Sequence, residues 1–144
     1  MRFAGRIWKD GKFWLAEVPM LNAMTQGRSP RGALRMMVDL ILTIGDHPAL
    51  DVAVFPGAGE AFEIGSDNVS TLVAIMLRRQ REKHNLTLSD VARRLGARSK
   101  TAYARYEQGS SVPTVAKLFE LLAAVAPDED FLLQQRHRSP TRAA

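Results

Sequence analysis

A short stretch of the chain carries side chains that are well suited to touch a nucleic acid. Between Ser99 and Gly109 the sequence places Lys100, Thr101 and Arg105 toward one side of a predicted helix. An arginine can donate two hydrogen bonds to the O6 and N7 atoms of guanine, and a threonine can bond a base edge or touch a thymine methyl group. The segment therefore predicts a surface that reads base edges in DNA.

Two short helices joined by a tight turn are predicted to hold these residues. Thr87 can accept a hydrogen bond from the backbone N–H of Asp90, and the Asp90 carboxylate can reach back to the N–H of Thr87, which makes a capping box. Gly96 can adopt the left-handed conformation that ends a helix. Ser99 is a good N-cap for the second helix. This pattern predicts a helix, a turn and a second helix that presents the basic side chains.

The charge distribution favours the same half of the chain. Residues 1–69 contain 7 Lys+Arg and 8 Asp+Glu, whereas residues 70–144 contain 13 and 7, which together give the net charge of +5. The excess of positive charge therefore lies in the second half, where it would supply phosphate affinity without selecting a sequence. The basic residues considered for this role are Arg78, Arg79, Arg81, Lys83, Arg93, Arg94, Arg98, Lys100 and Arg105.

The stretch from about Ser70 to Ala126 resembles the phage-repressor, or Cro-type, helix-turn-helix domain. The resemblance rests on Val91-Ala92 and Leu95-Gly96 in the first helix, and on Tyr106-Glu107-Gln108-Gly109 closing the second. It implies base contacts from the second helix and phosphate contacts at the start of each helix. One extra residue before Glu107 leaves the register of the base contacts open. The predicted DNA-binding residues are Ser89, Arg98, Ser99, Lys100, Thr101, Arg105 and Gln108.

The first half of the chain predicts a small sheet covered by one helix. Residues 3–8 and 12–18 are rich in aromatic and branched side chains and are joined through Asp10-Gly11, a strong hairpin signal. A polar loop containing Thr25-Gln26-Gly27 follows. Ser29 can cap a helix that starts at Pro30 and ends near Gly45. Two further strands are expected at residues 51–55 and 60–64, giving the order β-β-α-β-β.

This half resembles the HicB-type antitoxin domain, a small truncated relative of the RNase H fold. The resemblance rests on Phe3-Ala4-Gly5, the Asp-Gly turn, the segment from Trp14 to Pro19, the Thr25-Gln26-Gly27 loop and a helix near Ser29. It implies a type II antitoxin that binds a small mRNA-cleaving HicA-type toxin and represses its own operon. No short motif marks toxin contacts, so toxin-binding residues stay unassigned. The alternative is a stand-alone repressor whose first domain dimerises or binds a small ligand.

These observations predict an α+β protein in three parts. Residues 1–66 form the HicB-like domain, residues 70–133 the all-α helix-turn-helix domain, and residues 134–144 a disordered tail. Ser70 is expected to cap a helix over residues 71–84, and the acidic run Asp128–Asp130 to begin a helix after Pro127. Reading two half-sites needs a homodimer or higher oligomer. Its interface is either the edge of the N-terminal sheet or the helix over residues 114–125.

Other classes of function find little support in the sequence. No enzyme activity is expected, and no cofactor or metal, because His47, His84 and His137 are scattered and cysteine is absent. An RNA-binding adaptor would need exposed aromatic rings, whereas Tyr103 and Tyr106 are expected to pack in the core. The longest apolar run is too short to span a bilayer, so the protein is expected in the bacterial cytoplasm, at the nucleoid when bound to its operator. A two-metal nuclease would need several carboxylates that converge on Mg²⁺. The candidates, none of which is expected to serve in this way, are Asp10, Glu17, Asp39, Asp51, Glu60, Glu63 and Asp67.

Overall fold

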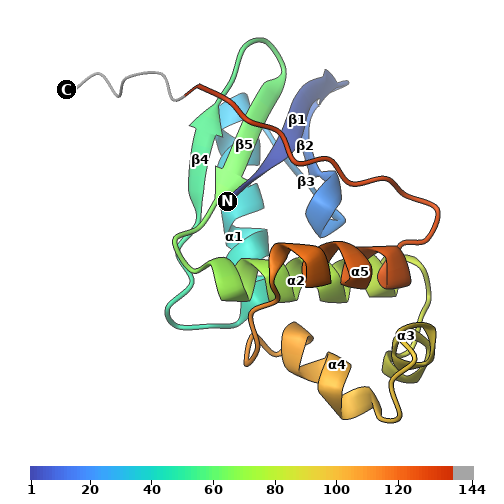
Figure 1. The fold of residues 1–144 in the computed structure, drawn as a ribbon. Coiled ribbons are helices and arrows are strands. Elements are labelled where there is room, and N and C mark those ends of the chain that lie inside the picture. The colour runs from blue at the N-terminus through green and yellow to red at the C-terminus, as the bar shows by residue number, and fades with distance from the viewer. Residues whose placement is uncertain (138–144) are drawn as a thin grey trace.

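A computed structural model describes residues 1–137 and has the expected α+β layout. A five-stranded antiparallel sheet, in the order β3-β2-β1-β5-β4, precedes a group of helices (Figure 1). The strands are β1 (Arg2–Asp10), β2 (Phe13–Val18), β3 (Ala23–Gly27), β4 (Ala53–Pro56) and β5 (Ala61–Gly65). The helices are α1 (Pro30–Gly45), α2 (Val69–Lys83), α3 (Leu88–Arg94), α4 (Lys100–Glu107) and α5 (Val115–Val125), with a short 3-10 turn, η1 (Pro19–Leu21).

The N-terminal half contains one strand more than the sequence predicted. The segment expected to be a polar loop around Thr25-Gln26-Gly27 is strand β3, which pairs antiparallel with β2 over Ala23–Gly27. The chain reverses through η1 and Asn22, whose φ of 44° is left-handed. The order is therefore β-β-β-α-β-β, and the predicted order was wrong. Strand β3 lies at the edge of the sheet, and its pairing with β2 depends on the turn at Asn22 that precedes it.

Helix α1 covers one face of the sheet, as expected. The Ser29 hydroxyl caps its first turn by accepting a hydrogen bond from the N–H of Gly32 at 3.0 Å, and Pro30 occupies the first helical position. Alternate residues of the strands face this helix. Among residues 1–137, no helix covers the opposite face of the sheet (Figure 1). The fully buried contributors are Ala16, Val18, Ala23 and Ile64 from the strands, and Ala33, Met37 and Ile41 from α1.

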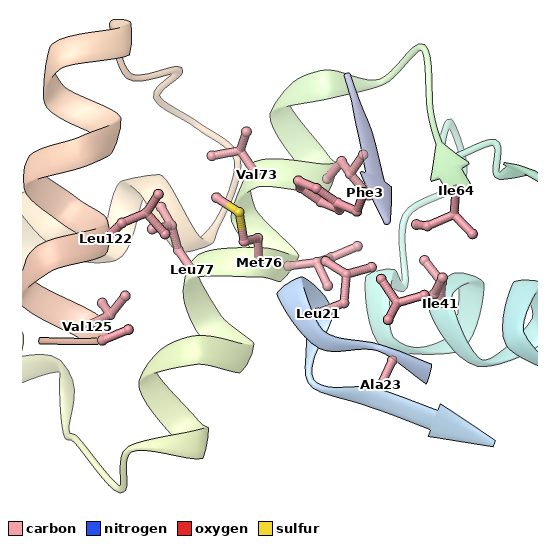
Figure 2. Packing of buried hydrophobic residues seen from close by; sticks show 14 of the residues in the cluster. Phe3, Leu21, Ala23, Ile41, Ile64, Val73, Met76, Leu77, Leu122 and Val125 are labelled. Atoms are coloured by element: carbon pink, nitrogen blue, oxygen red, sulfur yellow. The ribbon is translucent and has the colours of Figure 1, made fainter. Parts of the chain in front are cut away.

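Helix α2 joins the sheet half to the helical half. Its buried residues Val73, Met76 and Leu77 lie between side chains of the sheet half, such as Phe3, and side chains of α5, such as Leu122 (Figure 2). One hydrophobic core thus runs through both halves of the chain. Asn68 caps α2 by accepting from the N–H of Thr71 at 3.1 Å, so the predicted cap at Ser70 was wrong.

Polar contacts reinforce this junction. The Arg79 guanidinium donates to the carbonyl oxygens of Leu21 at 3.1 Å and Asn22 at 2.6 Å, and the Gln80 amide donates to those of Pro19 and Met20. The turn before β3 is therefore held by α2. The predicted boundary at residues 66–70 coincides with the connection between β5 and α2, and the division into two domains stays a prediction.

The chain after α5 runs back across the sheet without forming a helix or strand up to His137 (Figure 1). The expected helix after Pro127 is therefore absent, and that prediction was wrong. The Arg136 guanidinium lies 2.7 Å from the Glu63 carboxylate on β5, on the face opposite α1. The predicted tail begins at residue 134, and its last part, residues 138–144, lies outside the described residues.

Candidate nucleic-acid interface

The capping box predicted for the first helix of the motif is present. The Thr87 hydroxyl accepts from the N–H of Asp90 at 3.1 Å, and the Asp90 carboxylate accepts from the N–H of Thr87 at 2.8 Å. The Thr87 hydroxyl also donates to the Asp90 carboxylate, at 2.7 Å. This hydrogen bond, followed by the one from the N–H of Thr87, holds the pKa of the Asp90 carboxyl below its usual value. Gly96 has a φ of 69° and follows the end of α3. The turn to α4 closes at Ser99, whose hydroxyl accepts from the N–H of Thr101 at 3.1 Å.

A buried ion pair fixes helix α4 against α2. The Arg81 guanidinium donates to both carboxylate oxygens of Glu107, at 2.7 and 3.0 Å, and the two side chains are 15% and 7% exposed. The Tyr103 hydroxyl donates to the same carboxylate at 2.6 Å. Burial, and then the nearby Glu107 carboxylate, raise the pKa of Tyr103 well above its usual range. This network fixes the orientation of α4 against α2. It therefore also fixes the direction in which the exposed side chains of α4 point.

The outer face of α4 presents polar side chains along one stripe. Thr101, Arg105 and Gln108 follow the spacing i, i+4, i+7 and are all exposed. Ala102 is exposed beside them, and the partly exposed Ala104 adds little bulk. Tyr103 is buried and Tyr106 packs partly against the core, as expected from the sequence. An exposed helix face with small residues and long donors has the shape needed to enter a major groove.

The N-terminal ends of α3 and α4 share an open hollow of about 270 Å³. Ser89, from the first turn of α3, lies on one side, and Arg98, Ser99 and Lys100 lie on the other. Helix N-termini with hydroxyls and cations suit phosphate oxygens. Arg93 also lines this hollow; it was counted among the basic residues that supply phosphate affinity but not among the seven predicted DNA-binding residues. The i, i+4 spacing of Ser89 and Arg93 on a predicted helix is the signal that could have found it.

Several arginines counted toward DNA affinity have internal partners instead. Arg78 donates to the carbonyl oxygen of Ile44, and Arg94 donates to that of Ala124 at 3.0 Å. Arg79 and Arg81 make the contacts described above, and Lys83 pairs with Glu129. These side chains are held by partners within the protein, and their part in phosphate affinity stays a prediction. The exposed cations on or near α3 and α4 are Arg93, Arg94, Arg98, Lys100 and Arg105, and of these Arg94 donates to the carbonyl oxygen of Ala124.

Comparison with known proteins agrees with this geometry. Residues 77–125, from the second half of α2 to the end of α5, match the sequence model of the family described as Helix-turn-helix. No curated protein matches the chain. The fold of α2 to α5 and this match define the helical half as a helix-turn-helix DNA-binding domain, and the chain as a transcription regulator. The DNA-contacting role of each of the seven predicted residues stays a prediction.

Two further observations concern other kinds of site. Within residues 1–137, no helix is long and apolar enough to cross a membrane. Over the same range, no three His, Asp or Glu side chains come together as metal ligands would. Two of the carboxylates weighed for metal binding have other partners: Asp51 accepts from the Ser66 hydroxyl at 2.9 Å, and Glu63 pairs with Arg2 and Arg136.

Proposed function

We propose that this protein is an antitoxin that represses its own operon and neutralises a small HicA-type mRNA-cleaving toxin by direct binding in the bacterial cytoplasm. The single observation that carries the proposal is the fusion of a DNA-reading helix pair to a small sheet with one helix-free face. The helix pair would bind the operator. The helix-free face of the sheet would bind the protein partner.

The operator contacts divide into two groups by position. Thr101, Arg105 and Gln108, on the outer stripe of α4, reach base edges and specify the sequence. The residues around the hollow between α3 and α4 bind phosphate and set the register of the protein on the duplex. Lys100, expected from the sequence among the base readers, is placed in this group because it lines the hollow. The members of this second group are Ser89, Arg93, Arg98, Ser99 and Lys100.

We propose that the toxin docks on the helix-free face of the sheet, which the segment after α5 crosses at Glu63 of β5. The alternation of β1 places Trp8 on this face, opposite the buried Phe3 and Ile7, and the guanidinium carbon of Arg6 lies 4.2 Å from the centre of its ring. Leu15 on β2 pairs with Trp8, and Met24 on β3 is 55% exposed. Aromatic, Met and Arg side chains are enriched at protein interfaces. Trp14 lies on the other face and packs against the core.

The test is to search for a gene beside this one that encodes a small basic protein, and to co-express the two proteins. The proposal expects that the neighbour arrests growth alone, that co-expression relieves the arrest, and that the two proteins co-purify. Met24→Glu on the helix-free face should weaken rescue, whereas Met36→Glu, on exposed α1 surface, should not. A chain that binds DNA while no neighbour is toxic or co-purifies would contradict the antitoxin role. It would point instead to a stand-alone repressor with a small ligand.

A further inference from the structure

Residues 128–137, called the strap below, leave the end of α5 and cross the helix-free face of the sheet (Figure 1). The beginning of the strap is fixed at the end of α2. The Asp128 carboxylate lies 2.8 Å from the Nε2 atom of His84, and Glu129 pairs with Lys83. Phe131 then packs against the hydrophobic core. The strap therefore starts from a fixed point and extends from there toward β5.

The far end of the strap contacts the sheet at Glu63. Strand alternation places Glu63 on the face opposite the buried Phe62 and Ile64. The Oε2 atom of Glu63 is 3.3 Å from a guanidinium nitrogen of Arg2, and its Oε1 atom is 2.7 Å from a guanidinium nitrogen of Arg136. Arg136 thus contacts the carboxylate oxygen that Arg2 leaves open.

Neighbouring side chains of the sheet hold the Glu63 carboxylate in place. The guanidinium carbon of Arg2 lies 3.4 Å from the centre of the Phe55 ring, and Phe55 is the register partner of Glu63 on β4. The Glu63 side chain is only 18% exposed. Hydrogen bonds between a guanidinium and a carboxylate are among the strong ones in proteins. The open oxygen of Glu63 is therefore a binding site for one guanidinium, and Arg136 of the same chain occupies it.

The charge of the strap and its continuation matches that of the partner proposed for this face. Residues 134–144 contain three arginines and no Asp or Glu, whereas residues 1–69 contain 7 Lys+Arg and 8 Asp+Glu. A basic segment is thus placed against the more acidic half of the chain, as charge complementarity favours. The proposed toxin is a small basic protein. The strap and the toxin would use the same chemistry against the same face.

The end of the strap is held weakly enough to be displaced. The Arg136 side chain is 58% exposed, and an ion pair with such exposure shifts an equilibrium by only about two- to fivefold. Leu132 and Leu133, between Phe131 and Arg136, are 92% and 86% exposed and add little packing. A partner that contacts more of the sheet than Glu63 alone can therefore replace the strap.

We propose that the strap is an internal ligand of the sheet, which occupies the Glu63 site in the free protein and leaves it when a basic protein docks there. Two guanidinium groups cannot occupy the same position on one carboxylate oxygen. The strap therefore lowers the apparent affinity of the partner in proportion to the fraction of molecules whose face is open. The naming of that partner as a toxin rests on the proposed function, whereas the binding of the strap to Glu63 does not.

The position of the strap is tested on the full chain without a partner. The chain contains no cysteine, so the exposed Gln135, replaced as Gln135→Cys, gives a single attachment point for a spin label. The label should broaden the amide NMR signals of β5 and of the part of β1 that pairs with it. Adding Arg136→Glu should reduce this broadening by about two- to fivefold. The control Lys12→Glu, which reverses an exposed cation in the β1–β2 turn, should leave it unchanged.

The outcomes of this measurement are distinct. Arg136 is exposed, so Arg136→Glu should keep the circular dichroism spectrum and the melting temperature of the parent protein. Absence of broadening on β5 in the parent protein, or broadening that Arg136→Glu does not reduce, would overturn the inference.

Competition is tested with a synthetic peptide that has the sequence of residues 128–144. A tethered segment has an effective concentration of about millimolar, so the peptide is titrated into that range. It should remove the broadening from the labelled chain, and it should bind Arg136→Glu about two- to fivefold more tightly than the wild type. Equal affinity for both proteins would overturn the inference.

The small basic neighbour protein, titrated in the same way, separates this inference from the proposed function. Both are supported if the neighbour binds and removes the broadening. If the peptide competes but the neighbour does not bind, the antitoxin role fails and the strap remains. If the neighbour binds and the broadening persists, the strap is not its competitor, and the inference fails alone.

Discussion

Arg81 on α2 and Glu107 on α4 form an ion pair with two N–H···O hydrogen bonds, which joins the helix shared with the sheet half to the helix that carries Arg105. Both N–H···O contacts, 2.7 and 3.0 Å long, lie at a site largely closed to water. Coulombic attraction is less screened there than at the surface. The orientation of α4, and therefore of Arg105, depends on this pair.

Replacing the carboxylate should destabilise the fold. Glu107→Gln leaves the Arg81 guanidinium buried without an opposite charge, and we expect a loss of about 2 to 3 kcal/mol in the free energy of unfolding. Urea denaturation followed by circular dichroism measures it. The double variant Arg81→Met/Glu107→Met removes both charges and should recover part of the loss. A change below about 0.5 kcal/mol for Glu107→Gln would mean that the pair does not hold α4.

Arg105 should specify one base pair. Arg105→Ala should cost about 1 to 3 kcal/mol on the preferred operator and remove the preference at one position only. Titration of wild type and variant against operators with single base changes measures this. Lys12→Ala, which removes an exposed cation from the N-terminal half, is the control and should change neither quantity. An equal loss on every sequence would make Arg105 a phosphate contact.

Arg93 and Arg78 should contribute differently to DNA affinity, although both lie in the basic second half of the chain. Arg93→Ala should weaken binding to all DNA sequences alike and lower the salt dependence of affinity by about one counterion. Arg78→Ala should leave the salt dependence unchanged and reduce stability, because the Arg78 side chain donates to the Ile44 carbonyl oxygen. Affinity measured over a series of salt concentrations, with a thermal melt of each variant, separates the two effects. The distinction fails if Arg78→Ala also lowers the salt slope.

The capping box of α3 should make stability depend on acidity. Because the pKa of Asp90 is lower in the folded protein than its usual 3.8, the unfolded chain binds more protons between those two values, and stability rises with pH there. The contribution is complete above about pH 5 and is lost as pH falls through the folded pKa. Thermal melts across this range should show a shallower slope for Asp90→Asn than for the wild type.

Features set by neighbouring residues were predictable from the sequence. The caps at Ser29, Thr87 and Ser99 and the helix starting at Pro30 depend on atoms within four residues, and the structure contains all of them. Strand β3 was missed because its pairing with β2 depends on the turn at Asn22, which carries no strong sequence signal.

Features set by distant contacts were not predictable. Arg78, Arg79 and Arg81 look like any basic cluster in sequence, and only the packing of α2 against α1, η1 and α4 gives them partners. Arg93 was likewise omitted from the site, since the hollow it lines forms where two helix ends meet. A long charged side chain can bond to any acceptor that the fold brings within its reach. Counting charges in the sequence therefore overestimates the number of cations that are free to contact DNA.

The most direct test of the central claim is selection of binding sites from a random duplex library with the wild-type protein and with Arg105→Ala. The account predicts that the wild type enriches a defined motif, and that the variant enriches the same motif with one position relaxed. Binding without any enriched motif, or identical motifs from both proteins, would contradict sequence reading by α4.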